Sequence, residues 1–353
     1  MAVDRIADAE QAVHAYTEMR EKWRTGRGVY RRDGRLWVPR LAAHLWPFSQ
    51  ALVATVLVAG IGEELTPAFA ARDAIAADLA TLERYWQADA VHPAYSSDVT
   101  GSRVGGDRYY DDNAWIGLVL VLLERVRPGW SRVDRALATY EFALSGWDED
   151  GGGVFWVEQG RGAGRRNHDR NLVSTAPSAQ LGLQLGELGG REHSAGAPVG
   201  PEEMYTWVVN TLDESRDGTG LFSDKVRGDG SIDRTQWSYN QGTMVGLNLA
   251  LARARGPRQA DYLGRAEMIA RKALGRLELA SEPLAFNAIF FRNLLSLHAA
   301  SGDAQLRDEI VSALRRYTED VSSQTPATLL DASAIVQLLA LLAWEPSAYR
   351  NLG

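Results

Sequence analysis

The chain has 353 residues, 45% of them hydrophobic, and a net charge of −7 at pH 7. This acidic balance excludes a protein that binds mainly to nucleic-acid phosphates, because such binding needs a basic surface. The absence of cysteine excludes disulfides, thiolate metal sites and a cysteine nucleophile. The chain is rich in aromatic residues, with 11 Trp and 12 Tyr. Several stand beside Gly, Asp or Asn, as is typical of residues that line a groove or an interface.

Twelve helices are predicted from the apolar periodicity and from the Gly, Pro and Asp residues that interrupt it. In chain order they cover residues 4–23, 40–60, 66–88, 110–126, 131–145, 172–188, 201–212, 238–254, 258–277, 285–300, 303–321 and 328–343. Strand signals are scarce, and residues 154–158 and 221–226 are predicted as short strands within loops. The second helix contains an apolar stretch of about the length of a membrane span. Its polar residues, such as Ser49 and Gln50, instead favour a buried core helix and no membrane span.

Alternate helices differ in character. The even-numbered helices are apolar nearly all round, whereas the odd-numbered ones carry charge on one face. A helix that is apolar all round is buried, and an amphipathic helix faces solvent. We therefore predict an all-α fold, an (α/α)6 barrel of six helical hairpins, with an inner and an outer ring. No linker of disordered composition divides the chain, so residues 1–353 are expected to form a single domain.

Compartment and partners follow from what the sequence lacks. The first thirty residues are charged and show no apolar signal segment. We expect a cytoplasmic protein as the chain is given, or a secreted one if the chain has been trimmed. A monomer is expected, with no cofactor, no nucleic-acid partner and no metal, since the histidines show no zinc-binding spacing. His44 and His298 lie in predicted inner helices and are interpreted as core groups.

Two adjacent acids, Asp111 and Asp112, begin a strongly apolar helix. Capping that helix requires one aspartate, and these two are flanked by Tyr109, Tyr110 and Trp115. Two carboxylates close together cannot both ionise freely, so one keeps its proton and the other becomes the anion. A glycosidase needs such a pair, with one group protonating the leaving oxygen and the other acting at the anomeric carbon. The sequence alone does not say which aspartate is the anion.

Other loop ends combine aromatic and polar groups. A sugar ring has an apolar face and a rim of hydroxyls, and these two side-chain types match them. We predict that one open groove collects the substrate-binding residues, several of which stand at the starts of inner helices. They are Tyr109, Tyr110, Asn113, Trp115, Trp147, Trp156, Asp224, Trp237, Tyr239, Asn240 and Gln241.

Over about residues 40–343 the sequence resembles glycoside hydrolase family 76, the endo-α-1,6-mannanases with the related fungal wall transglycosidases. The most specific motif is Tyr109-Tyr110-Asp111-Asp112-Asn113-Ala114-Trp115. Others follow in order at residues 145–148, 152–156, 220–224, 237–242 and 290–292. One departure is Thr175, where the family pattern has Asn.

The resemblance implies an (α/α)6 barrel and a retaining mechanism on α-1,6-linked mannan or mannooligosaccharides. Asp111 would attack C1 as the nucleophile and Asp112 would protonate the leaving O6 as the acid/base. Because the aromatic residues are spread over many loops, endo cleavage is expected. A transglycosylase on the same fold and a non-catalytic mannan-binding protein stay as alternatives. A sugar epimerase is less favoured, because it would rely on a histidine pair.

Overall fold

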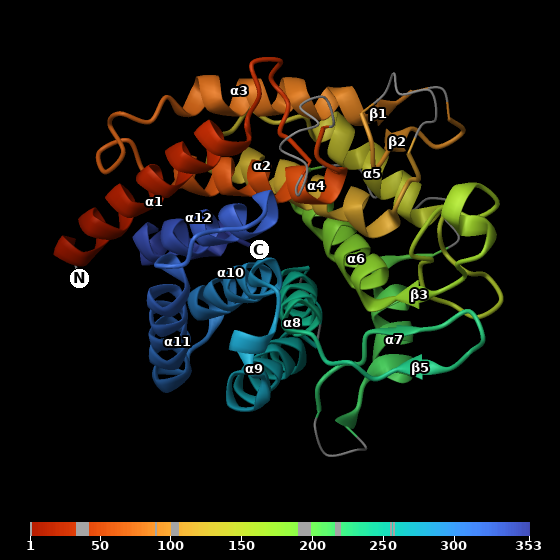
Figure 1. Cartoon of the computed structure of the whole chain (residues 1–353). Helices are drawn as coiled ribbons and strands as arrows, with labels where there is room; N and C mark the ends of the chain where they lie inside the picture. Colours follow the sequence, from red (N-terminus) through yellow and green to blue (C-terminus); the bar gives the residue numbers. More distant parts are fainter. Residues whose placement is uncertain are drawn as a thin grey trace.

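The computed structural model describes residues 2–32, 42–88, 90–99, 106–189, 199–215, 220–254, 256 and 258–353. Twelve α-helices run through these residues (Figure 1). They are α1 (Ala2–Trp23), α2 (Leu45–Gly60), α3 (Ala71–Leu82), α4 (Tyr110–Val126), α5 (Val133–Leu144), α6 (Leu172–Glu187), α7 (Pro201–Leu212), α8 (Ser238–Arg253), α9 (Gln259–Arg276), α10 (Leu284–Ala300), α11 (Ala304–Ser322) and α12 (Leu329–Ala343). Short 3-10 helices add η1 (Glu83–Tyr85), η2 (Gly162–Arg165), η4 (Leu279–Ser281) and η5 (Pro346–Asn351).

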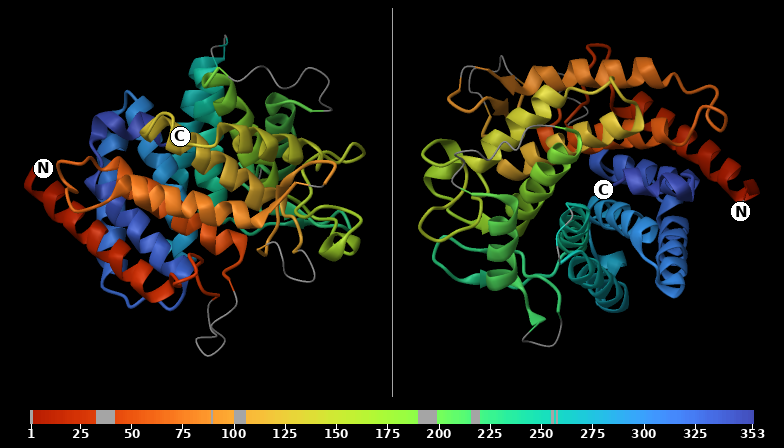
Figure 2. Two further views of the ribbon diagram at one scale, coloured as in Figure 1. Left: turned by 90° about the horizontal axis from the view of Figure 1, so that it is seen from above. Right: turned by 180° about the vertical axis from the view of Figure 1, so that it is seen from behind.

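The even-numbered helices form a closed inner ring. Each contacts the next in the order α2, α4, α6, α8, α10 and α12, and α12 contacts α2. The odd-numbered helices pack outside: α1 on α12, α3 on α2, α5 on α4, α7 on α6, α9 on α8, and α11 on both α10 and α12. Two further views show α1 and α3 outside the inner helices (Figure 2). The predicted (α/α)6 barrel is confirmed.

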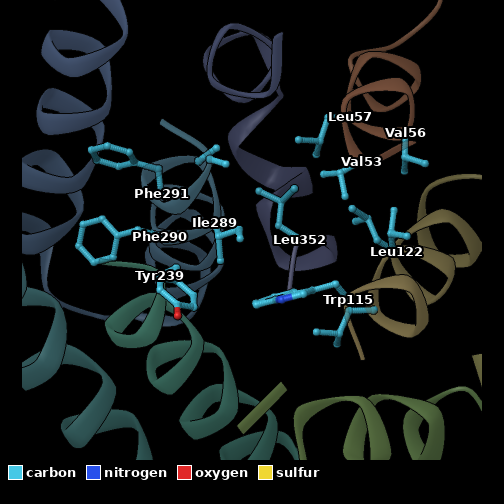
Figure 3. Close-up of a cluster of buried hydrophobic side chains, with 14 of the residues drawn as sticks. Val53, Val56, Leu57, Trp115, Leu122, Tyr239, Ile289, Phe290, Phe291 and Leu352 are labelled. Carbon is cyan, nitrogen blue, oxygen red and sulfur yellow. The ribbon is translucent and has the colours of Figure 1, made fainter. Parts of the chain in front are cut away.

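Burial explains which helix joins which ring. Along α8 every residue from Ser238 to Ala252 is buried. On the outer helix α9 the buried residues recur at intervals of three or four, as in Tyr262, Ala266 and Ile269, which is the spacing of an amphipathic face. Gly242 lets α8 approach α10 closely, since a Cβ there would lie 2.6 Å from the Phe290 Cα atom. In the barrel centre, side chains of α2, α4, α8 and α10 pack together (Figure 3).

The β structure is small. β1 (Trp86–Gln87) pairs antiparallel with β2 (Ala94–Tyr95), and β3 (Arg170–Asn171), β4 (Lys225–Val226) and β5 (Ile232–Asp233) form an antiparallel sheet in that order. Of the strand predicted over residues 221–226, only β4 forms. The prediction of a strand over 154–158 is wrong, because Val154, Phe155 and Val157 each make an isolated bridge to a different segment.

Two predicted helices differ from the observed ones by more than two residues at an end. The helix predicted over 66–88 is shorter, since α3 ends at Leu82, η1 follows, and Trp86 pairs with Tyr95 in β1 and β2. The helix predicted from residue 40 begins at Leu45, because His44 has an extended backbone and Ala42 pairs with Arg31. Residues 40 and 41 lie outside the described residues. Within the described chain, none of the helices has the length and apolar character needed to cross a bilayer.

Candidate active site

A cleft of ≈ 580 Å³ opens at one end of the barrel. It is lined by His44, Trp46, Pro47, Ser97, Tyr109, Asp111, Asp112, Trp115, Trp156, Asn171, Val173, Asp224, Lys225, Tyr239 and Phe286. Several of these residues belong to the first turns of α2, α4, α6, α8 and α10. These five inner helices therefore point the same way, with their N-terminal ends toward the cleft.

Asp111 accepts two N–H hydrogen bonds. Its Oδ1 atom accepts from the backbone N–H of Asp112 at 2.9 Å, and its Oδ2 atom accepts from the indole Nε1–H of Trp156 at 3.0 Å. Burial raises the pKa of the Asp111 carboxyl, while these two hydrogen bonds oppose the rise. The positive end of the α4 dipole also favours an anion in this first turn. Asp111 is therefore the carboxyl of the pair whose charged form is supported.

Asp112 lies in a different environment. It is buried, and within the described part of the chain no hydrogen bond to its carboxyl is seen. Burial raises the pKa of Asp112 well above its ordinary value, and the neighbouring charge of Asp111 adds to the rise. These directions favour Asp112 as the carboxyl that keeps a proton when the pair holds one. The two adjacent carboxyls thus differ in their tendency to hold a proton because their hydrogen-bond partners differ.

Trp156 reaches the pair from the long loop between α5 and α6. Its backbone carbonyl accepts from Tyr110 N–H at 3.0 Å, and its backbone N–H donates to the Asp169 carbonyl at 2.9 Å. Its ring packs on Tyr109, with the ring centroids 4.9 Å apart. The loop turns at Gly153, which has φ of 85° and lies against Trp207, a conformation that favours glycine. The loop is thereby fixed over the start of α4.

A third carboxyl, Asp224, also lines the cleft. Its Oδ1 atom accepts from Asn240 Nδ2 at 2.9 Å and from the Tyr239 hydroxyl at 3.3 Å. Burial raises the pKa of Asp224, whereas the Asn240 hydrogen bond and the charge of Lys225 lower it. Lys225 itself pairs with Asp169 at 3.2 Å. This carboxyl can accept hydrogen bonds from the hydroxyls of a bound sugar.

Of the thirteen site residues predicted from the sequence, seven line the cleft. They are Tyr109, Asp111, Asp112, Trp115, Trp156, Asp224 and Tyr239. The remaining six lie outside its lining: Tyr110, Asn113, Trp147, Trp237, Asn240 and Gln241. Their contacts explain why they lie outside the lining, and a role of these six residues in sugar binding stays a prediction.

Asn113 and Gln241 hold loops in place. Asn113 accepts from the Tyr95 backbone N–H at 2.8 Å and donates to the Tyr95 carbonyl at 2.9 Å. Gln241 makes the same pair of bonds with Phe222, both at 2.9 Å. Each carboxamide thus satisfies the buried backbone of a loop that passes an inner helix.

The aromatic residues among these six pack against the loops that surround the cleft. Tyr110 stacks on Phe142 with centroids 4.5 Å apart. Trp237 meets Phe286 edge-on at 5.5 Å, and the backbone of Trp147 pairs with Val154. These side chains fill space between loop and barrel. Asn240 acts on the cleft indirectly, through Asp224.

Asn171 and His44 are among the polar residues that line the cleft but were not predicted as site residues. Asn171 is 6% exposed, and its Oδ1 atom is buried without a hydrogen-bond partner in the described chain. It precedes α6 as Tyr109 precedes α4, and this N-cap position was the signal that could have identified it. His44 was interpreted as a core group, but its side chain is 48% exposed and lies 3.3 Å from Asp98. It stands at the cleft because α2 begins one residue later.

The family model of glycosyl hydrolase family 76 matches residues 68–328. The chain belongs to glycoside hydrolase family 76. The resemblance carried by the Asp111–Asp112 motif is thereby confirmed. Members of this family are classed as glycoside hydrolases, and this protein is classed with them. No match to a curated protein was found.

Several solved structures share the fold along nearly the whole chain. The family 76 α-mannanase of Bacteroides thetaiotaomicron is 16% identical, with 97% of this chain and 96% of that one covered and a TM-score of 0.79. An inactive variant of the α-1,6-mannanase of Salegentibacter sp., in complex with α-1,6-mannotriose, is 18% identical, with 95% and 99% covered and a TM-score of 0.74. Dfg5 from Chaetomium thermophilum, in complex with glucosamine, is 15% identical, with 95% and 90% covered and a TM-score of 0.66.

Proposed function

We propose that the protein is a retaining glycoside hydrolase that cleaves α-1,6-mannosidic linkages in mannan or mannooligosaccharides. The observation that carries the proposal is the unequal pair at the start of α4. Asp111 accepts two N–H hydrogen bonds that favour its charged form, whereas burial and the charge of Asp111 raise the pKa of Asp112 well above its ordinary value. The Salegentibacter α-1,6-mannanase offers a parallel, since its variant with two consecutive aspartates replaced by asparagine is inactive and binds α-1,6-mannotriose.

The proposed reaction has two steps. Asp111 attacks C1 while Asp112 donates its proton to the leaving O6, so that the glycosidic bond breaks and a glycosyl ester forms on Asp111. Asp112, now ionised, then takes a proton from water as that water attacks C1. The ester bond breaks, and the pair returns to one proton and one charge.

The cleft offers suitable contacts for the sugar. Trp156, Trp115 and Tyr109 provide apolar ring surface near the pair, while Asp224 and Asn171 provide acceptors for hydroxyls. The cleft falls in the volume range of pockets that enclose small ligands. Its lining comes from five inner helices and their loops, which supports binding of several sugar units and endo cleavage.

The test is incubation with α-1,6-mannooligosaccharides of defined length, with products followed by mass spectrometry and NMR. We expect shorter mannooligosaccharides whose new reducing ends first appear as the α-anomer. Appearance of the β-anomer would contradict retention. Products longer than the substrate would identify a transglycosylase. Binding without cleavage would identify a carbohydrate-binding protein and refute the proposal.

A further inference from the structure

A second, much smaller cavity lies in the barrel centre, beneath the cleft. Its volume is ≈ 10 Å³, room for about one water-sized particle. Trp115 lines both this central cavity and the cleft. Leu352 and Leu122 form part of its apolar wall, and Figure 3 shows both beside Trp115.

A buried cation faces the central cavity. Arg292 of α10 is 7% exposed, and in the described residues its guanidinium has neither an ion pair nor a hydrogen bond. Burial lowers the pKa of Arg292 to about 10, so the side chain is still charged at neutral pH. The nearby Arg125 is different, since it pairs with Glu187 at 2.6 Å and donates to the Gly353 oxygen at 2.5 Å. The charge of Arg292 therefore lacks the compensation that Arg125 receives.

Two carboxamides point to the same place. Gln180 and Gln184 of α6 are 4% and 3% exposed, line the central cavity, and make no side-chain hydrogen bond with the described protein. Buried polar side chains are ordinarily hydrogen-bonded. Three such groups around one cavity, with no acidic residue in its lining, indicate a polar species held between them.

We propose that the central cavity binds a monatomic halide, chloride under ordinary conditions, held by the Arg292 guanidinium and by the amide N–H groups of Gln180 and Gln184. An anion is favoured over water because an unpaired buried charge is costly, and water would leave that charge uncompensated. The small volume excludes phosphate and sulfate. The halide would tie α10 to α6 below Trp115, and so would stabilise the floor of the cleft.

The first experiment measures the thermal unfolding midpoint of the whole protein in sodium chloride and in sodium gluconate. Ionic strength is kept equal, so that general screening cancels. Gluconate is too large for the central cavity, so the midpoint should rise only with chloride, by about 2 °C at ten times the dissociation constant. An equal midpoint in the two salts would overturn the proposal.

Two variants test where the effect arises. Gln184→Glu places a carboxylate in the central cavity, which should neutralise Arg292 and remove the response to chloride. Arg316→Met, which removes an exposed arginine, is the control and should keep the full response. A Gln184→Glu protein that still responds to chloride would contradict the assignment. Because the readout is stability, the result is independent of the substrate proposed above.

Direct evidence would come from crystals grown in sodium bromide. An anomalous peak beside the Arg292 guanidinium is the expected result. An ordered Arg292 with no anomalous peak would overturn the proposal. Bromide in the crystal without any chloride effect on unfolding would identify an adventitious ion only, and would also overturn it.

Discussion

Replacing Trp156 with phenylalanine isolates the hydrogen bond that favours the charged form of Asp111. The change keeps an aromatic ring against Tyr109 but removes the Nε1–H that donates to Asp111 Oδ2 at 3.0 Å. Because that hydrogen bond lowers the pKa of Asp111, its loss should raise it. The proposed mechanism requires ionised Asp111, so the acidic limb of the pH–rate profile should move to higher pH.

The size of the expected pKa shift of Asp111 follows from the free energy of the hydrogen bond that Trp156 donates. A hydrogen bond to a charged group contributes about 1.5–3 kcal/mol, and one pKa unit corresponds to about 1.4 kcal/mol. Since Trp156 is only half-buried, the lower figure applies, and we expect a shift of about one unit. On the acidic limb kcat/KM should fall about tenfold, and the loss should shrink as pH rises above the limb.

The assay is kcat/KM on an α-1,6-mannooligosaccharide from pH 4 to 9. Trp237→Phe is the matched control, because its indole packs on Phe286 and does not line the cleft. It should leave the acidic limb in place. If Trp156→Phe lowers activity equally at every pH, the bond does not set the protonation of Asp111, and the reasoning fails.

Three further predictions concern the pair and its support. On a substrate with a good leaving group, Asp112→Asn should still form a glycosyl-enzyme, and added azide should restore turnover. Asp111→Asn should form no glycosyl-enzyme. If mass spectrometry finds the trapped sugar on Asp112, the roles of the two aspartates are reversed. Asn240→Leu removes a hydrogen bond that lowers the pKa of Asp224, so the pKa of Asp224 should rise and KM should increase about tenfold. An unchanged KM would count against contact between Asp224 and the sugar. Asn113→Leu leaves two backbone groups unpaired and should cost about 2–4 kcal/mol in urea unfolding, while a loss below 1 kcal/mol would refute its role in holding the loop.

The fold could be predicted from the sequence because the helices of the inner and outer rings differ in their hydrophobic pattern. The prediction for α4 is the same as the observed helix, and that for α8 differs by one residue, since apolar inner helices end where polar loops begin. The end of α3 was missed because Trp86 continues the apolar pattern of that helix, although Trp86 and Gln87 pair with β2. Local periodicity does not reveal such pairing.

The site was accessible only in part. Adjacent aspartates are visible in any sequence, but the donor that distinguishes them, Trp156, lies 45 residues away. A tryptophan at a loop end can face the cleft, as Trp156 does, or pack the loop, as Trp237 does. The direction of the side chain decides between these roles, and that direction is set by tertiary packing. The same holds for His44, whose exposure depends on where α2 begins.

The direction of the inner helices gives the barrel an electrical polarity. At least five of them point their N-terminal ends at the cleft, and helix N-termini favour anions. The carboxyls Asp111, Asp112 and Asp224 gather at that end, while Arg125 and Arg253 occupy the last turns of α4 and α8. Asp111, the proposed nucleophile, therefore lies where the backbone itself favours negative charge. Burial raises the pKa of both carboxyls of the pair. At Asp111 the hydrogen bonds from Trp156 and from the Asp112 backbone N–H oppose that rise, whereas at Asp112 the charge of Asp111 adds to it. Two identical side chains, adjacent in the chain, thus differ in how strongly their surroundings favour the charged form, because they differ in the hydrogen bonds that they receive.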